Sequence, residues 1–397
     1  MAVNEDLQLP YTMDRHQLET PYQARVLRTD VNRTLPTYIP DLLEESTLAM
    51  EGRFRNGSDT SMVTPVFDTM THLVARISNR VIFGPELCRN EKFLQSVIHF
   101  AETTPLIAAP IQWSPYALRP VVYFILTSIL GGKKQALKYI VPYLEKYKEQ
   151  SADQERAWLL SEHIMCNALP GESVQGIATR LINIEFGSIH TSSIFITQAL
   201  FEIAILPKEG VERMRAEVQD ALETEGGWNK ASVDKFYMIE SALREVGRYH
   251  GLMHFALPRF TMIHTNLDDG TYVPPGYKVA IDMKAVHFDP EIYPDPHICD
   301  LFRFSKLRAQ EGAANKYGFA TVDSHYLPFG AGRHSCAGRQ FASLELRIML
   351  AHILLEYNID LPPGLTERPN NVLFNGAIIP DPKAQLVFTP KSRKRSM

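Results

Sequence analysis

A long proline-free stretch in the middle of the chain places the strongest constraint on its fold. Residues 171–206, GESVQGIATRLINIEFGSIHTSSIFITQALFEIAIL, are mostly apolar and stop at Pro207. As one helix this stretch would run roughly 50 Å, which is the width of a whole domain. A helix of that length in a globular protein crosses the core. We therefore expect a mainly α fold with a smaller β region, built around one long central helix.

Composition limits the class of protein. The chain has 397 residues, of which 45% are hydrophobic, and a formal net charge of −4. These values suit a globular core and do not mark a nucleic-acid binder. Cys88, Cys166, Cys299 and Cys336 lie far apart, and the first 20 residues contain no apolar signal segment. We therefore expect a reducing, cytosol-facing location.

The longest apolar run, VVYFILTSIL at 121–130, has two interpretations. It is about half the ~20 residues that a membrane-spanning helix needs, so we expect no transmembrane anchor. The favoured interpretation is a buried helix. The alternative is a helix or loop that dips into a membrane surface between the basic residues Arg119 and Lys133, with peripheral association with the endoplasmic reticulum.

The second half of the chain changes character. Helical periodicity predicts helices over 232–250 and 338–357. Between them, residues 254–283 contain strand-like segments separated by DDG and PPG turns. Residues 288–304, FDPEIYPDPHICDLFRF, are rich in proline and predict an irregular segment.

Cys336 lies in the glycine-rich segment FGAGRHSCAGR, 329–339. It directly precedes a predicted helix, whose positive end favours a thiolate. Arg333, His334 and Arg339 add positive charge. Three interpretations follow from these residues: a cysteine nucleophile, a zinc site with His325 and His334, and a thiolate ligand to haem iron.

The spacing of this segment resembles the haem-binding loop of the cytochrome P450 family. The pattern Phe-x-x-Gly-x-x-x-Cys-x-Gly is met by Phe329, Gly332, Cys336 and Gly338, while Ala337 stands where many relatives have proline. The resemblance implies that Cys336 is the axial ligand to haem iron and that Phe329 packs against the ligand loop. It also implies that His334 faces a haem propionate.

Two further segments resemble the same family. Glu245 and Arg248 in EVGR, with Arg303 in DLFRF, match a buried Glu-Arg-Arg network that braces the ligand loop. FGSIHTSS, at 186–193, resembles the oxygen-activation segment, in which Thr191 would bind dioxygen and pass protons. His190 replaces the usual acid and is either a proton relay or a passive polar residue. The cluster of poor helix formers also predicts a local opening of the helix.

The resemblance assigns the remaining site residues. Arg259 in HFALPRF and Arg28 are candidate propionate partners. TPYQARVLRTDVNRTLP, at 20–36, resembles the haem-flanking helix and arrives early in the chain. We therefore expect one cytochrome P450 domain over 1–397, shortened at its N-terminus by an anchor, a helix and sheet strands. An apolar substrate pocket is expected to use Phe186, Ile189, Phe255, Leu257, Ile378 and Ile379.

The implied activity is monooxygenation. One oxygen atom of dioxygen would enter an apolar secondary metabolite of terpenoid, polyketide or alkaloid type. Electrons would come from NADPH through a separate cytochrome P450 reductase, and the motif style resembles fungal members. Two alternatives remain at this point: a truncated, non-catalytic haem-binding protein, and a haem-thiolate isomerase or dehydratase that needs no reductase.

Overall fold

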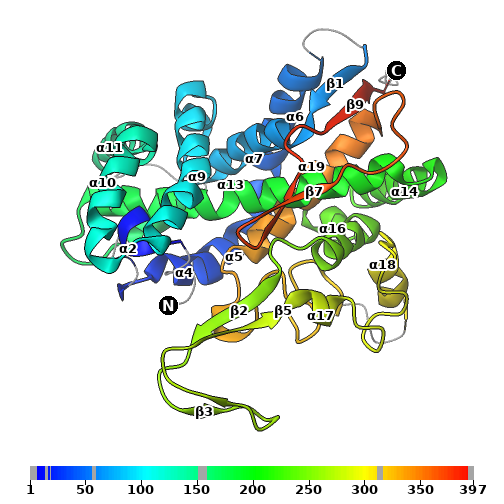
Figure 1. The fold of residues 1–397 in the computed structure, drawn as a ribbon. Coiled ribbons are helices and arrows are strands. Elements are labelled where there is room, and N and C mark those ends of the chain that lie inside the picture. The colour runs from blue at the N-terminus through cyan, green and yellow to red at the C-terminus, as the bar shows by residue number, and fades with distance from the viewer. Residues whose placement is uncertain are drawn as a thin grey trace.

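The long proline-free stretch forms a single helix. A computed structural model describes residues 7–391 except 14–16, 18, 56–59, 151–158 and 311–315. In it, α13 spans Val174–Ile205 and crosses the molecule from side to side (Figure 1). Ser173 caps its start by accepting a hydrogen bond from the Gly176 amide, and the helix ends before Pro207. Its helical assignment is continuous through 186–193, so the predicted local opening is not observed.

The other long helices pack around α13, so the core of the protein surrounds its middle (Figure 1). The mainly α prediction is confirmed. The helices in direct contact with α13 include α7 (Val66–Ile82), α9 (Glu91–Trp113), α11 (Lys133–Gln150), α16 (Tyr237–Tyr249) and α19 (Arg339–Glu356).

Shorter helices complete the α-helical part. The predicted helix at 232–250 is divided into α15 and α16, with residues 234–236 between them. The shorter elements are α2 (Leu9–Thr12), α4 (Tyr22–Val26), a π-helical turn (Leu27–Val31), α5 (Asn32–Thr34), α6 (Ile39–Met50), α8 (Pro85–Cys88), α10 (Arg119–Leu130), α12 (Leu160–Cys166), α14 (Lys208–Thr224), α15 (Lys230–Val233), α17 (Met283–His287) and α18 (Arg303–Arg308).

The β part consists of small antiparallel sheets. β1 (Met62–Pro65), β9 (Gln385–Pro390) and β6 (Tyr357–Asp360) form one sheet in the order β1-β9-β6. The other pairs are β2 (Phe255–Phe260) with β5 (Lys278–Asp282), β3 (Thr265–Asn266) with β4 (Tyr272–Val273), and β7 (Asn371–Phe374) with β8 (Ala377–Pro380).

The strand-like segment at 254–283 becomes a projecting hairpin. β2 pairs with β5, and the chain beyond them extends away from the body through β3 and β4 (Figure 1). The ladder is irregular between Ala256 and Arg259. At that point Leu257 has a φ of +51°, a left-handed conformation that is unfavourable for a residue with a branched side chain.

The apolar run at 121–130 is not buried, so the favoured sequence interpretation was wrong. It forms most of α10, in which no residue is buried. Phe124 is 71% exposed and Ile129 is 73% exposed. α10 packs mainly on α9, and its side chains find too few neighbours there to be covered. Within the described ranges, no helix is long and apolar enough to cross a membrane.

Candidate haem site

Cys336 lies on a loop that backbone hydrogen bonds close on itself. Its amide donates to the Phe329 carbonyl at 2.8 Å, and the Ser335 amide donates to the Gly332 carbonyl at 3.1 Å. Gly330 and Gly332 have φ angles of +68° and +64°. Glycine adopts this region without the steric cost that a Cβ would impose. The glycines therefore shape the loop that presents the sulfur.

Aromatic stacking fixes this loop against the central helix. The Phe329 ring stacks on Phe195 of α13 with centroids 5.9 Å apart, and it meets Phe319 edge-on at 5.0 Å. Phe195 and Phe319 also contact each other at 5.1 Å. Such aromatic contacts stabilise a core beyond the burial of their surface area. The loop residue expected to pack beneath the ligand therefore lies in a buried aromatic cluster.

A cavity of about 260 Å³ lies between the Cys336 loop and α13. Gly187 and Gly338 both line it, and a Cβ added to either would meet no atom within 4 Å. Both walls therefore have free space beside their glycines. The lining consists of Gln23, Ala24, Leu27, Ile82, Leu160, Asn183, Ile184, Gly187, Ser188, Thr191, Ser192, Phe329, Cys336, Ala337, Gly338, Phe341 and Ala342.

The Cys336 thiol is free and faces this cavity. Burial raises the pKa of the Cys336 thiol, while the amides of Gly338 and Arg339 and the charges of Arg339 and Arg28 act in the opposite direction. A metal ion bound to the sulfur deprotonates a thiol outright. The same amides and cations would then stabilise the thiolate.

Positive charge gathers beside the loop. Partial desolvation and the charges of Arg333, Arg259 and Arg28 hold the pKa of the exposed His334 below its usual value. Arg28 also donates to the Ser335 carbonyl at 2.8 Å. Guanidinium groups are strong partners for carboxylates. The structure therefore places the three predicted propionate partners, Arg28, Arg259 and His334, within electrostatic reach of one another.

Glu245, Arg248 and Arg303 form one network. Arg248 donates to both Glu245 oxygens, at 2.8 and 2.7 Å, and Arg303 donates at 3.1 Å. The Asp300 amide adds a fourth hydrogen bond at 3.0 Å. The side chains of Glu245 and Arg248 are fully buried. The remaining donors of Arg248 and Arg303 bind backbone carbonyls of the proline-rich segment, among them Pro296 and Ile298.

His287 connects this network to the ligand loop. Its Nδ1 is 2.9 Å from the Arg248 carbonyl, and its Nε2 accepts the Leu327 amide at 3.1 Å. The Leu327 carbonyl in turn accepts the Gly330 amide at 2.8 Å. Sequence analysis did not identify His287, because no local pattern distinguishes it from a surface histidine.

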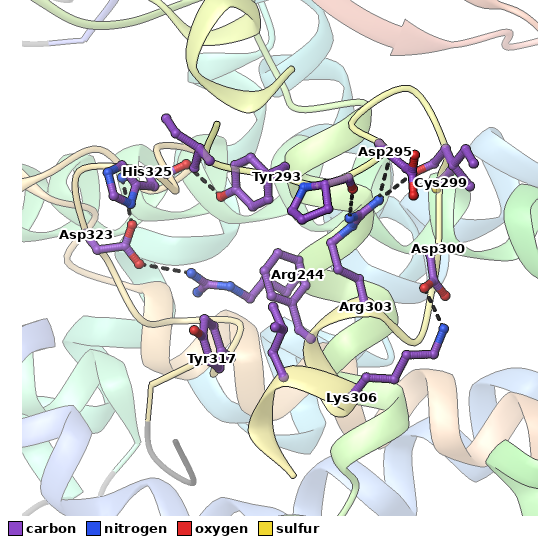
Figure 2. A pocket seen from close by; sticks show the side chains of 15 residues that line it. Arg244, Tyr293, Asp295, Cys299, Asp300, Arg303, Lys306, Tyr317, Asp323 and His325 are labelled. Carbon is purple, nitrogen blue, oxygen red and sulfur yellow. Dashed lines mark hydrogen bonds and ion pairs between the residues drawn. The ribbon is translucent and has the colours of Figure 1, made fainter. Parts of the chain in front are cut away.

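A polar hollow lies on the outer side of the same network. Figure 2 shows the side chains that line it. Arg303 donates to the carbonyls of Pro294 and Asp295 there. Lys306 pairs with Asp300 at 2.7 Å, and Arg244 pairs with Asp323 at 3.0 Å. Its arginine and lysine side chains are thus paired within the protein. His325 lines this hollow rather than the Cys336 cavity, which removes the basis for a zinc site with Cys336.

The two predicted catalytic residues of the oxygen-activation segment, Thr191 and His190, have different surroundings. Thr191 lines the cavity, and its hydroxyl donates to the Gly187 carbonyl at 2.7 Å. The His190 ring instead lies by the backbone of Ala101 in α9, which opposes the lowering of the pKa of His190 by burial. His190 does not belong to the described cavity lining. The two residues predicted to act together therefore face different neighbours.

The predicted substrate residues lie outside this cavity lining. Ile189 and Ile378 are buried, whereas Phe255 is 58% exposed. Phe186 meets the Phe100 ring edge-on at 6.3 Å. Leu257 lies beside Gly330 of the ligand loop. Their assignment to substrate binding stays a prediction.

Ser192 is a lining residue that sequence analysis did not assign a role. It lies close to the fully buried Glu345 of α19, where it opposes the rise that burial causes in the pKa of Glu345. The one available signal was a charged residue, Glu345, inside the apolar segment ASLELRIMLAHILL. The partnership itself joins residues far apart in the chain, so no local pattern could reveal it.

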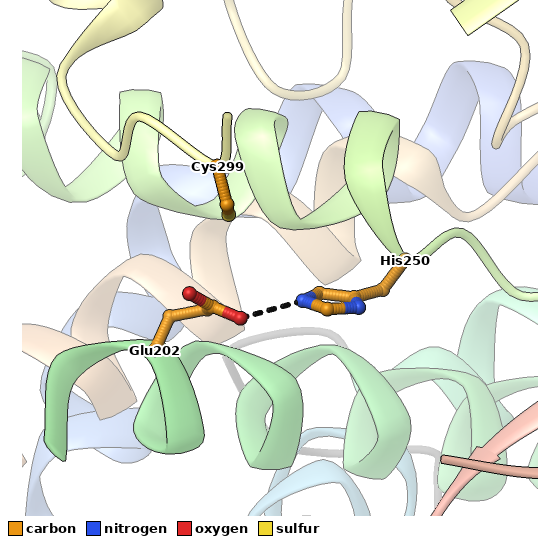
Figure 3. Close-up of side chains that lie close together, drawn as sticks. All are labelled: Glu202, His250 and Cys299. Atoms are coloured by element: carbon orange, nitrogen blue, oxygen red, sulfur yellow. Dashed lines mark hydrogen bonds and ion pairs between the residues drawn. The ribbon is translucent and has the colours of Figure 1, made fainter. Parts of the chain in front are cut away.

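Another cysteine, Cys299, lies beside Glu202 and His250 with ligand atoms within 4.8 Å of one another (Figure 3). Two contacts make this a structural cluster rather than a metal centre. Arg368 pairs with the same Glu202 oxygen, at 2.7 Å, that His250 Nε2 approaches at 2.8 Å. The Asn371 amide nitrogen lies 3.3 Å from His250 Nδ1. This leaves the proton on Nε2, directed at the carboxylate.

Comparisons with known proteins agree on one family. The cytochrome P450 family model matches residues 21–388. Cytochrome P450 monooxygenase 103 of Postia placenta is 29% identical over 98% of this chain and 78% of its own. Monooxygenase AN1598 of Emericella nidulans is 30% identical over 94% and 71%. Ent-kaurene oxidase P450-4 of Gibberella fujikuroi is 29% identical over 98% and 77%.

Solved structures share the fold at low sequence identity. The retinoic acid-bound cyanobacterial CYP120A1 has a TM-score of 0.71 at 17% identity, covering 93% of this chain and 78% of that one. The cytochrome P450DA haem domain has a TM-score of 0.72 at 17% identity, with 98% and 82% covered.

The residues present fit a haem group. The cavity has open walls at Gly187 and Gly338, a free thiol in Cys336 and cationic side chains nearby. A cysteine thiolate is one of the side chains that hold haem iron, and cationic side chains pair with the two propionate carboxylates of the haem. Together with the family match, these features show that the chain belongs to the cytochrome P450 family and is a haem-dependent monooxygenase.

Proposed function

We propose that this monooxygenase, a single domain over 1–397, oxidises an apolar secondary metabolite, with electrons from NADPH delivered by a separate cytochrome P450 reductase. The observation that carries the proposal is the free Cys336 thiol in a largely apolar cavity that also contains Thr191. Apolar lining selects apolar ligands and leaves orientation to a few polar groups. The ent-kaurene oxidases among the relatives favour a terpenoid substrate.

Each predicted residue has a part in this proposal. Cys336 would hold the haem iron, and Arg28, Arg259 and His334 would bind the propionates. Thiolate-bound haem supplies O–O bond cleavage. Thr191 offers a hydroxyl at the cavity surface. Its bond to the Gly187 carbonyl can be exchanged for a bond to dioxygen, because a serine or threonine hydroxyl rotates to suit its partner.

Two surfaces support the proposed environment. The cationic side chains around Arg333 suit an acidic face of a reductase. α10 and the residues just before it expose a group of large apolar side chains. This favours peripheral contact with the cytosolic face of the endoplasmic reticulum. They are Trp113, Tyr116, Leu118, Val121, Phe124, Ile125 and Ile129.

The decisive experiment is an absorbance spectrum of the haem-loaded protein, reduced and exposed to carbon monoxide. We expect the Soret band of a haem-thiolate protein. A fungal cytochrome P450 reductase, NADPH and a panel of terpenoid hydrocarbons then test the reaction. NADPH-dependent product supports the proposal. Bound haem without any NADPH-dependent product would favour a non-catalytic haem protein, and product formed from a peroxide without reductase would favour an isomerase or dehydratase.

A further inference from the structure

Two side-chain amides line the Cys336 cavity, and their partners fix the direction in which each of them faces. Gln23 belongs to α4, and Asn183 belongs to α13. An amide donates hydrogen bonds from its NH₂ group and accepts them at its oxygen, and the two ends have the same shape. The partners of each amide therefore decide what it offers to the cavity.

Arg180 determines the direction of Gln23. The Arg180 side chain is 0% exposed, and a guanidinium group can only donate hydrogen bonds. It donates to Gln23 Oε1 at 2.8 Å, to the Thr20 carbonyl at 2.7 Å and to Glu172 at 2.6 Å. The Gln23 oxygen must therefore face Arg180, and its NH₂ group is left without a partner in the described chain. Gln23 thus offers a hydrogen-bond donor to the cavity.

A second amide, Gln17, determines the direction of Asn183. Gln17 is buried, and its NH₂ group donates to the Gly176 carbonyl at 3.4 Å, because a carbonyl can only accept. The Gln17 oxygen consequently accepts from the NH₂ group of Asn183. The Asn183 oxygen faces away from this contact, is buried, and has no partner among the described residues. Asn183 thus offers a hydrogen-bond acceptor to the cavity.

The two amides together match a hydroxyl group. Leaving a buried acceptor unpaired is costly, so the unfilled Asn183 oxygen indicates that a ligand supplies its partner. The hydroxyls of Ser188 and Thr191 do not, because they donate to carbonyls of their own helix at 3.2 and 2.7 Å. A ligand hydroxyl accepts from one group while it donates to another, whereas an aldehyde or ketone only accepts and a hydrocarbon does neither.

The position of Asn183 along α13 adds a distance. Asn183, Gly187 and Thr191 follow one another at intervals of four residues, and all three line the cavity. Arg180 precedes Asn183 by three residues, so both amides lie at the same turn of the helix. Eight residues of α-helix separate this turn from Thr191, which corresponds to roughly 12 Å along the helix axis.

We propose that Gln23 and Asn183 determine substrate specificity by binding a hydroxyl group that the apolar substrate already carries. Gln23 donates to the hydroxyl oxygen, and the hydroxyl donates to Asn183. The inference deepens the proposed function and rests on it. The substrate is an apolar alcohol, and the new oxygen enters its far end, roughly 12 Å from the bound hydroxyl. A hydrolysis or an earlier oxygenation must supply such an alcohol.

Calorimetric titration of the haem-loaded protein tests this binding without turnover. The ligands are farnesol, farnesal and the hydrocarbon of the same skeleton, and the alcohol, aldehyde and hydrocarbon of a kaurane skeleton. In at least one series we expect the alcohol to bind at least about tenfold more tightly than the hydrocarbon, with the aldehyde between them, because two hydrogen bonds of ordinary strength give such a ratio. Equal dissociation constants of alcohol and hydrocarbon in both series would overturn the proposal.

Substitutions test the two amides separately. Gln23→Leu and Asn183→Leu should each reduce the preference for the alcohol at least about threefold, the loss of one hydrogen bond, and leave hydrocarbon binding unchanged. Gln95→Leu is the control, because the Gln95 amide binds Glu91 at 3.1 Å on the exposed side of α9. Gln23 is half-buried and its removal leaves Arg180 its other partners, so Gln23→Leu decides the question if Asn183→Leu does not fold. Lost haem-thiolate content with an unchanged alcohol preference would show that the amides serve the haem, and would refute the proposal.

Product analysis tests the distance. With NADPH and a fungal reductase, the alcohol that binds more tightly should be oxidised at the end remote from its hydroxyl. Oxidation beside the hydroxyl would contradict the position assigned to the amides. Absence of any NADPH-dependent product, with the alcohol preference and its loss in Gln23→Leu intact, would instead refute the proposed function and leave this binding site standing.

Discussion

The Glu245→Gln substitution provides the sharpest test of how the ligand loop is supported. Glu245 accepts four hydrogen bonds, three of them from the guanidinium groups of Arg248 and Arg303. Glutamine keeps the shape but replaces one acceptor oxygen with an NH₂ group that faces donors. It also leaves Arg248, which is fully buried, without its counter-charge. Removing one partner of a buried ion pair costs about 3–5 kcal/mol, so we expect a loss of stability of this size.

The assay is urea unfolding of the haem-loaded protein, with haem content measured by the reduced carbon monoxide spectrum. Glu86→Gln is the control, because Glu86 pairs with Lys146 at the surface and both side chains are more than half exposed. Such exposed pairs contribute about 0–1 kcal/mol. We expect Glu245→Gln to lose haem at urea concentrations that leave the control intact. Equal unfolding of the two variants would refute the view that this network holds the irregular segment beneath the loop.

Other predictions follow from single residues. Cys336→Ser should abolish the thiolate-type Soret band while the fold persists by circular dichroism. Gly332→Ala forces a side chain into φ +64° and should cost about 1–2 kcal/mol, seen as faster haem loss. Phe124→Asp should weaken binding to anionic phospholipid vesicles without changing the spectrum. Burial lowers the pKa of His287 to about 4, so the unfolded chain binds its proton at higher pH. Stability should therefore fall by about 2 kcal/mol from pH 7 to pH 5, and less in His287→Gln.

Local patterns predicted the elements that carry their own signal. The proline-free stretch defined α13 to within a few residues, and the glycine spacing placed the ligand loop. The exposure of α10 could not be predicted, because an apolar run looks the same in sequence whether it faces the core or the surface. The division of α15 from α16 was missed because apolar periodicity continues through the three residues between them.

Side chains that pair across long stretches of sequence could be predicted only from the family resemblance, or not at all. Arg303 pairs with Glu245 across 58 positions, and the family pattern alone suggested that they meet. Ser78 reaches Glu345 across 267 positions, and nothing in the sequence links them. The sequence also did not predict which way a side chain points from its helix. His190 and Thr191 are neighbours in sequence, yet Thr191 lines the cavity and His190 lies by the backbone of Ala101 in α9.

Counter-charge, rather than burial, separates the buried acids of the described chain into two groups. Glu45, Glu202, Glu240 and Glu245 each pair with at least one arginine, and Glu162 lies in the first turn of α12, where helix amides compensate its charge. Glu185 and Glu345 have neither kind of compensation in the described chain, because their printed side-chain partners are the neutral Asn79 and Ser78 of α7. A fixed carboxylate needs a cation to hold structure together. An acid buried without a cation instead keeps its proton, which is why burial raises the pKa of Glu185 to about 8 and that of Glu345 to about 7.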